Sequence, residues 1–156
     1  MKFELVNELE VPASANDVWA IYSSPDFPKL LTKLVPGILE SVEYVEGDGH
    51  LGTVIHLVYV PGSVPLSYKE KFVTIDHEKR LKEAVHVEGG FLEMGVTFYM
   101  NSFEIIEKGS DCCIIRSMTK CEIEDKEIMN LISHISVANV TVLAMTISKY
   151  VQQHKK

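Results

Sequence analysis

The stretch Tyr68-Lys69-Glu70-Lys71-Phe72 alternates between lysines and larger or acidic side chains. Residues two apart share one face of a β-strand, so this alternation predicts a strand with two different faces. Tyr68, Glu70 and Phe72 then point the same way. If that face is the inner one, a phenol and a carboxyl group lie among apolar neighbours, where burial raises the pKa of the carboxyl group.

A short turn, Asp76-His77-Glu78-Lys79, separates this strand from the next, which carries Lys82. The register of the hairpin decides the face on which Lys82 lies. If Ile75 pairs with Arg80, Lys82 faces away from Glu70. If Thr74 pairs with Arg80, both charged residues face the same cavity. The sequence leaves both registers open, and two solvated charges in a hairpin rich in Lys and Glu are a further alternative.

Further segments of strand character lie on both sides of this hairpin, with turn residues between them. The predicted strands span Phe3–Val11, Ile38–Glu46, Thr53–Val60, Ser67–Ile75, Arg80–Glu88, Gly95–Glu107 and Asp111–Glu122. Their regular spacing predicts one antiparallel sheet of about seven strands.

Helical patterns occur in two places. Ser14 followed by Asp17 is a variant of the capping box and predicts a short helix after the first strand; a second short helix is predicted over Lys29–Leu34. From Asp125 onward the apolar residues recur at helical spacing, which predicts one amphipathic helix of about 25 residues. These residues are Ile128, Leu131, Ile132, Ile135, Val142, Leu143 and Ile147. The whole predicts an α+β fold in which a strongly curved sheet wraps around the long helix and leaves an internal hydrophobic cavity.

Composition limits the possible functions. A chain of 156 residues with 46% hydrophobic content is expected to form a single ligand-cavity domain over residues 1–156. The net charge of -7 argues against nucleic acid as a partner. No apolar run reaches the roughly 18 residues of a membrane span. Three cysteines and an N-terminal stretch unlike a signal peptide lead us to expect reduced thiols and a cytoplasmic location.

Two motifs suggest binding sites that their context does not support. Gly47-Asp48-Gly49-His50-Leu51-Gly52 matches a dinucleotide-binding pattern, but that pattern requires a helix directly afterwards and a strand is predicted here. We therefore expect a hairpin loop with positive φ angles. The six histidines lack the spacing of metal ligands, so no metal site is expected; within the strands, His56 and His86 are expected to be polar surface or hydrogen-bonded core residues.

Several segments together resemble a known plant family. They are Glu8–Val11, Tyr22-Ser23, Gly47–Gly49 with Gly52-Thr53, Val60–Gly62, Tyr68–Phe72, Arg80–Lys82, Val87–Gly90, Gly95–Thr97 and Ile147–Lys149. The chain resembles the birch-pollen-allergen-like, pathogenesis-related class-ten proteins, and within them the norcoclaurine synthases. The likeness covers nearly the whole chain, and residues 76–84 are also similar to norbelladine synthases. The resemblance implies a helix-grip, START-like fold.

The resemblance to norcoclaurine synthases also implies a reaction. These enzymes condense dopamine with 4-hydroxyphenylacetaldehyde and cyclise the iminium ion by a Pictet–Spengler reaction. By this resemblance Lys82 engages the aldehyde oxygen and aids loss of water, Glu70 is the general base, and Tyr68 is the phenol at the cavity mouth. An apolar cavity protects an iminium ion from water, and no cofactor or metal is needed.

One further site position departs from the pattern. The synthases carry Asp where this chain has Asn101, and an amide cannot take up a proton. The resemblance also implies a set of apolar residues along the substrate tunnel, for which plain core packing is the alternative. They are Leu31, Val35, Ile38, Leu39, Leu57, Phe72, Phe91 and Leu143.

Three functions therefore stay open at this level. The first is a Pictet–Spengler condensing enzyme for a small aromatic amine and an aryl aldehyde. The second is a norbelladine-synthase-like protein that forms imines from tyramine but does not close the ring, to which Asn101 points. The third is a non-catalytic carrier of hydrophobic plant metabolites or hormones. The expected state is a monomer or a weak homodimer.

Overall fold

The computed structural model describes residues 1–131 and 133–154. Its strands are β1 (Lys2–Val11), β2 (Leu39–Glu46), β3 (Val54–Tyr59), β4 (Ser67–Asp76), β5 (Leu81–Gly89), β6 (Val96–Gly109) and β7 (Cys112–Ile123). Its helices are α1 (Ala15–Ser23), α2 (Phe27–Leu34), α3 (Ile128–Leu131) and α4 (Ala138–Gln153), with short 3-10 turns η1 (Gly90–Glu93) and η2 (Asp125–Glu127). The strands form one antiparallel sheet in the order β1-β7-β6-β5-β4-β3-β2.

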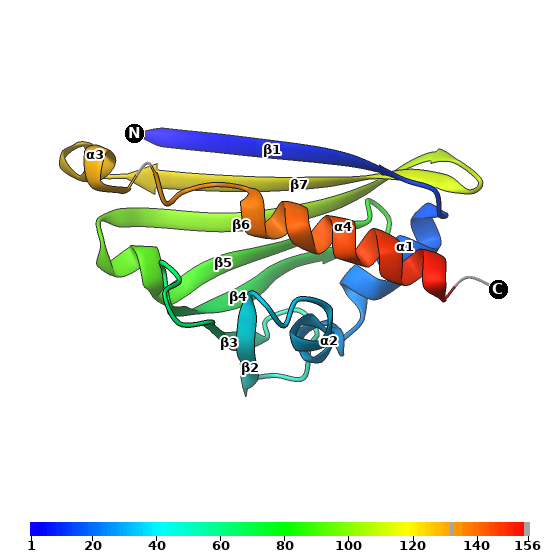
Figure 1. Ribbon diagram of the computed structural model, residues 1–156, viewed down its shortest axis with the longest axis horizontal. Helices are drawn as coiled ribbons and strands as arrows, with labels where there is room; N and C mark the ends of the chain where they lie inside the picture. Colours follow the sequence, from blue (N-terminus) through cyan, green and yellow to red (C-terminus); the bar gives the residue numbers. More distant parts are fainter. Residues whose placement is uncertain (132, 155–156) are drawn as a thin grey trace.

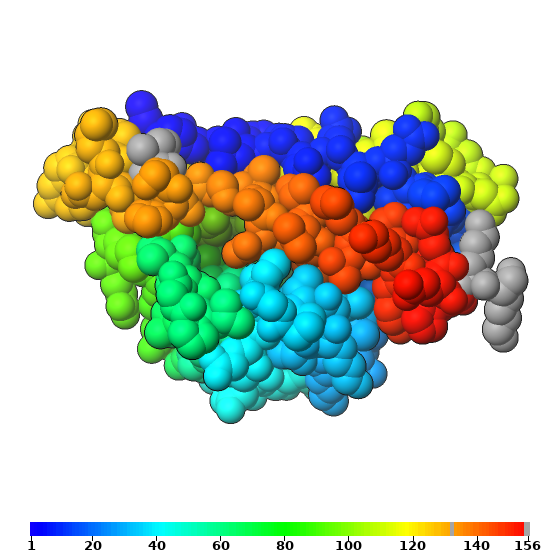
Figure 2. Space-filling view, in the orientation of Figure 1, coloured from blue at the N-terminus to red at the C-terminus, as the bar shows by residue number. Residues whose placement is uncertain are grey.

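The predicted α+β architecture is confirmed. Helix α4 lies across one face of the sheet (Figure 1). Helices α1 and α2 cover the end of the sheet that lies near the C-terminus of α4 (Figure 1). The sheet twists strongly, so that β2 runs in a clearly different direction from β1 (Figure 1). In the space-filling view α4, orange to red, covers the sheet and packs beside the blue and cyan segments of α2 and β2 (Figure 2).

Helix α1 lies where the sequence predicts, whereas α2 begins at Phe27 and not at the predicted Lys29, although it ends at Leu34 as expected. The side chain of Ser14 accepts a hydrogen bond from the Asp17 N–H at 3.1 Å, which caps α1. Pro25 follows the C-terminal cap of α1, and Pro28 lies in the first turn of α2, where its missing N–H costs nothing. A tight turn over residues 24–26 therefore joins the two helices.

The single long C-terminal helix that the sequence predicts is instead two helices. Helix α3 ends at Leu131, whose carbonyl accepts the N–H of His134, and α4 begins only at Ala138. The Ser136 hydroxyl accepts the Ala138 N–H at 3.2 Å. Serine side chains compete with the helical backbone in this way, which explains an interruption that apolar spacing alone does not reveal. The predicted apolar position Ile132 lies outside the described residues.

The register of the β4–β5 hairpin is neither of the two considered from the sequence. Ile75 pairs with Lys82 and Phe72 pairs with Ala84, and the ladder is irregular between Phe72 and Thr74. Such a β-bulge adds one residue to β4, so the strict alternation of faces is broken once. Lys82 therefore lies on the same face as Phe72, and the solvated-charge alternative is wrong because Lys82 is only 2% exposed.

Other local features agree with the sequence. Gly47, Gly49 and Gly52 have positive φ angles, as expected for a hairpin loop, and the strand β3 follows them where a nucleotide-binding turn would need a helix. All three cysteines carry free thiols. Among the described residues no helix is both long and apolar enough to cross a membrane.

Candidate active site

Lys82 lies at the closed end of the inner face, beneath α1 and α2. Its Nζ donates a hydrogen bond to the Tyr22 carbonyl oxygen at 2.9 Å. The same ammonium lies 4.2 Å from the ring centre of Phe72 and 4.5 Å from that of Phe27. Tyr22 is in the last turn of α1, where unpaired carbonyls and the helix dipole favour a cation. The site thus favours a protonated amine by contacts that are independent of Glu70.

Glu70 occupies the middle of β4 with its side chain turned to the cavity and 9% exposed. Burial raises the pKa of its carboxyl group to about 7, an effect that the positive charge of Lys82 partly offsets. Burial likewise lowers the pKa of the Lys82 amine to about 8, and the charge of Glu70 opposes this. No ion pair joins the two in the described part of the chain. Both groups therefore titrate close to neutral pH while they remain separate.

Tyr68 precedes Glu70 on the same face and shares a hydrogen bond with Tyr59 of β3. Their hydroxyl oxygens are 2.5 Å apart, and their ring centres are 5.6 Å apart. Burial raises the pKa of the Tyr68 phenol well above its usual value, and the nearby Tyr59 and Glu70 raise it further. The phenol is therefore a neutral hydrogen-bonding group at neutral pH.

The two tyrosines lie between two chambers. An inner chamber of about 60 Å³ is lined by Glu70 and apolar side chains, and an outer chamber of about 430 Å³ opens beside the loop over residues 62–65 and the segment that precedes α4. Tyr59, Tyr68, Asn101, Asn139 and Val140 line both. The outer volume is of the size that small ligands occupy, and the inner one is much smaller.

The apolar residues expected along the tunnel are brought together, with one exception. The inner chamber is lined by the predicted residues Leu31, Val35, Ile38, Leu39, Leu57 and Leu143. Phe91 lines the outer chamber. Phe72 instead lies under the Lys82 ammonium and lines neither, and Lys82 itself is enclosed by its partners.

Asn101 is placed on β6 so that its carboxamide borders both chambers. Its Oδ1 accepts a hydrogen bond from the Thr119 hydroxyl of β7 at 2.8 Å, and this contact is buried. The two residues pair across the β6–β7 ladder, which explains their common face. With Oδ1 occupied, the amide nitrogen is the group left to donate to a ligand.

His86 is a residue of the site that sequence reasoning missed. It is buried between Tyr68 and Tyr99, with ring centres 3.8 Å and 4.4 Å away, and burial lowers the pKa of its imidazole to about 3. Within residues 1–131 and 133–154 neither ring nitrogen has a hydrogen-bond partner, so the expectation of a surface or hydrogen-bonded histidine is wrong. The signal was available, because His86 lies four residues from Lys82 and so shares its strand face.

Tyr59, Asn139 and Val140 were also missed as lining residues. Tyr59 lies two residues after Leu57 on β3, and Asn139 lies four residues before Leu143 on α4. The same periodicities that placed Leu57 and Leu143 could therefore have found them.

Comparison with known proteins identifies the family. A model of the pathogenesis-related protein Bet v 1 family matches residues 1–154. The chain belongs to this family. S-norcoclaurine synthase 2 of Papaver somniferum is 45% identical over 97% of this chain, which spans 66% of that enzyme's length. Norbelladine synthase of Narcissus pseudonarcissus is 38% identical over 99% of this chain and 95% of its own length.

A solved structure of norcoclaurine synthase from Thalictrum flavum, in complex with dopamine and hydroxybenzaldehyde, is similar throughout. Its TM-score is 0.94 at 39% sequence identity, over 100% of this chain and 90% of that one. The backbone that surrounds the two chambers of this Bet v 1 family member is therefore shared with an enzyme that binds an aromatic amine and an aldehyde.

Proposed function

We propose that the protein is a norcoclaurine-synthase-like enzyme that condenses dopamine, or a closely related amine, with 4-hydroxyphenylacetaldehyde or a related aryl aldehyde. The observation that carries this proposal is the arrangement of Glu70 and Lys82. They share one face of the sheet, Glu70 lines the apolar inner chamber, and Lys82 lies behind it among Tyr22, Phe27 and Phe72. Burial brings the pKa of each toward neutrality. The similarity to norcoclaurine synthases over nearly the whole chain supports it.

The first half of the reaction forms an iminium ion. The amine nitrogen attacks the aldehyde carbon, and the resulting hydroxyl group leaves as water after it takes up a proton. The Lys82 ammonium is the nearby proton donor with a suitable pKa. In the structure it donates to the Tyr22 carbonyl, so it must exchange this partner for the substrate oxygen. The apolar walls then shield the iminium ion from hydrolysis.

The second half closes the ring. A carbon of the catechol ring attacks the iminium carbon, one carbon–carbon bond forms, and the electron pair of the C=N bond moves to nitrogen. The ring carbon then loses its proton to the Glu70 carboxylate, which restores aromaticity. A carboxyl group with a pKa of about 7 is substantially ionised at neutral pH and is a stronger base than an exposed one. Tyr68 and Asn101 border the space in which this happens and can hydrogen-bond substrate hydroxyls.

The test is a chiral-column analysis of the product formed from dopamine and 4-hydroxyphenylacetaldehyde, with and without protein. The uncatalysed reaction gives a racemate. We expect an excess of one enantiomer with the protein and its loss in Glu70→Gln. Glu88→Gln is a matched control. Glu88 lies on β5 of the same hairpin as Glu70, but its side chain is exposed and pairs with Lys69. A racemate at the background rate would contradict the proposal.

The alternative is a norbelladine-synthase-like function, imine formation without ring closure, which the similarity to the Narcissus relative supports. Asn101 favours it, because a carboxamide next to the inner chamber cannot share proton transfer with Glu70. Incubation with tyramine and an aryl aldehyde, followed by borohydride reduction, traps imines as secondary amines. Protein-dependent trapping without stereoselective cyclisation would favour this function.

A non-catalytic carrier is the remaining possibility, and it predicts tight binding of hydrophobic ligands in the outer chamber without turnover. We infer that residues 1–156 act as one ligand-cavity domain, alone or as a weak homodimer. The free thiols are consistent with a reducing compartment, and we place the protein in the cytoplasm.

A further inference from the structure

Two partners of the Lys82 ammonium lie on either side of one short turn of the chain. Its Nζ donates to the Tyr22 carbonyl oxygen at 2.9 Å and lies 4.5 Å from the ring centre of Phe27. Tyr22 lies one residue before the end of α1 and Phe27 begins α2, so the two residues lie on either side of the turn over residues 24–26. The position of this turn therefore sets the position of the ammonium.

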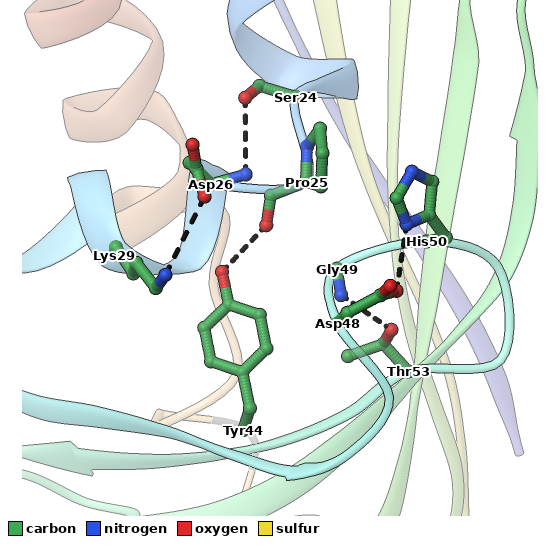
Figure 3. A network of polar contacts seen from close by, with 9 residues as sticks. All are labelled: Ser24, Pro25, Asp26, Lys29, Tyr44, Asp48, Gly49, His50 and Thr53. Carbon is green, nitrogen blue, oxygen red and sulfur yellow. Dashed lines mark hydrogen bonds and ion pairs between the residues drawn. The ribbon is translucent and has the colours of Figure 1, made fainter.

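Tyr44 of β2 holds the turn from the opposite side. Its hydroxyl donates to the Pro25 carbonyl oxygen at 2.6 Å (Figure 3). Lys29 closes over it, with Nζ 5.5 Å from the centre of the Tyr44 ring and 3.7 Å from the Asp26 carboxylate. Burial, followed by the charge of Asp26, raises the pKa of the Tyr44 phenol, which therefore remains a donor.

The glycine loop between β2 and β3 supports the same turn. A Cβ atom at Gly49 would lie 2.0 Å from the Pro25 carbonyl oxygen, so the loop approaches the turn as closely as glycine permits. The Gly49 N–H donates to Thr53 Oγ1 at 2.9 Å in a buried contact, which fixes the loop (Figure 3). Pro25 is thus held between Tyr44 and Gly49.

We propose that Tyr44 is a positioning residue for Lys82, because its hydroxyl fixes the Pro25 turn whose two ends supply the carbonyl and the ring that hold the ammonium. This role matters for catalysis only if the proposed function is correct. Hydrogen bonds weaken steeply with distance and angle, and small displacements of a catalytic group cost large factors in rate. Tyr44 itself touches neither chamber and is no part of the reacting groups.

The groups around Lys82 indicate in which direction its pKa should move when the Tyr44 hydroxyl is removed. Glu70 of β4 is the charged side chain that acts on it electrostatically, and Asp26 and Lys29 interact with each other and with Tyr44. Without the Tyr44 hydroxyl, the Tyr22 carbonyl and the Phe27 ring are held less firmly. The amine remains buried over Phe72, so its protonated form loses stabilising partners and no new ones replace them.

The experiment follows the Lys82 amine directly. Protein labelled with ¹³C at lysine Cε is titrated by NMR, and the Lys82 resonance is identified by its absence in Lys82→Met. We expect its titration midpoint to fall by at least about half a pH unit in Tyr44→Phe. Thr146→Val is the matched control, because it deletes another hydroxyl-to-carbonyl hydrogen bond, of 2.8 Å, on α4. An unchanged midpoint in Tyr44→Phe overturns the proposal.

A second variant and a separate readout complete the test. Gly49→Ala pushes on Pro25 from the loop side and should also move the Lys82 resonance; a shift in Gly49→Ala alone rejects the role of Tyr44. The titration does not depend on turnover. Stereoselective product with an unchanged Lys82 midpoint in Tyr44→Phe would reject the positioning role only. A shifted midpoint in a protein that makes no product would reject the proposed function only.

Discussion

The hydroxyl oxygens of Tyr59 and Tyr68 meet at 2.5 Å across the wall that separates the two chambers. Tyr68 is also stacked on His86, with ring centres 3.8 Å apart, so it is held on two sides. Tyr59 is partly exposed and has fewer constraints. Glu70 lines only the inner chamber, so an aromatic amine that enters through the outer chamber passes these two tyrosines on its way to Glu70.

We therefore expect Tyr59→Phe to admit ligands faster. The variant keeps the ring and removes a hydrogen bond whose net value is about 1 kcal/mol, which corresponds to roughly a fivefold higher association rate constant if opening limits entry. Stopped-flow measurement of dopamine binding, with the single Trp19 as the fluorophore, checks this. Tyr99→Phe serves as the control, because Tyr99 lines the outer chamber and not the inner one. Equal rate constants for Tyr59→Phe and the unaltered protein would contradict a gating role.

The rate of cyclisation should depend on pH as a narrow bell. It rises as Glu70, with a pKa of about 7, becomes ionised, and it falls as Lys82, with a pKa of about 8, loses its proton. The two apparent values belong to the coupled pair and not to either residue alone. Initial rates of enantiopure product across pH measure this profile.

Glu70→Gln provides an independent check on the same pair. It removes the negative charge that raises the pKa of Lys82, so the midpoint of the Lys82 titration should move further down. Its residual activity should lack the acidic limb and be lower by a factor on the order of 100 or more. Retention of the acidic limb would show that another group is the base.

Asn101→Asp restores the residue that the resemblance to norcoclaurine synthases implies at this position and tests what the amide changes. The new carboxylate can still accept the Thr119 hydrogen bond, so we expect the fold to be unchanged. A second carboxylate beside the inner chamber should raise the pKa of Glu70 and move the acidic limb of the profile to higher pH by about one unit. If ring closure is limiting, the ratio of cyclised product to trapped imine should rise. An unaltered ratio would mean that Asn101 only orients substrate hydroxyls.

His86→Phe should stabilise the protein. The phenyl ring can keep the stacking with Tyr68 and Tyr99, and it removes two buried nitrogens that find no partner in the described part of the chain. We expect the free energy of unfolding at neutral pH to increase by about 1 kcal/mol, measured by urea denaturation. His56→Phe, at a half-exposed site on β3, is the comparison. A loss of stability would indicate that a ligand or water normally satisfies His86.

His86→Phe should also make the free energy of unfolding less sensitive to acid. The pKa of His86 is about 3 in the folded protein, below its ordinary value of 6.5. Between these values the unfolded chain binds a proton that the folded chain does not, so the stability present above pH 6.5 is lost progressively as the pH falls toward 3. His86→Phe removes this contribution. If the free energy of unfolding fell equally with pH in His86→Phe and in the unaltered protein, this contribution of His86 would be contradicted.

The sequence by itself determined the strands, the start of the first helix and the two faces of β4. The alternation around Glu70 fixed a strand with Tyr68 and Phe72 on one side, Ser14 marked the start of α1, and the glycines of the loop after β2 marked its positive φ angles. These features depend on neighbours a few residues away, so a local pattern suffices to predict them. The family resemblance added Asn101 and the expected roles of Glu70 and Lys82.

The tertiary structure alone decided how these elements meet. A bulge after Phe72 sets the face of Lys82, and the serine-containing break before Ala138 ends what apolar spacing reads as one helix. The two chambers bring Tyr59 of β3 beside Asn139 of α4, and the Pro25 turn brings Tyr44 into reach of the Lys82 environment. Registers, bulges and cavities result from packing that minimises the free energy of the whole chain, and contacts between residues far apart in sequence leave no local pattern to predict them.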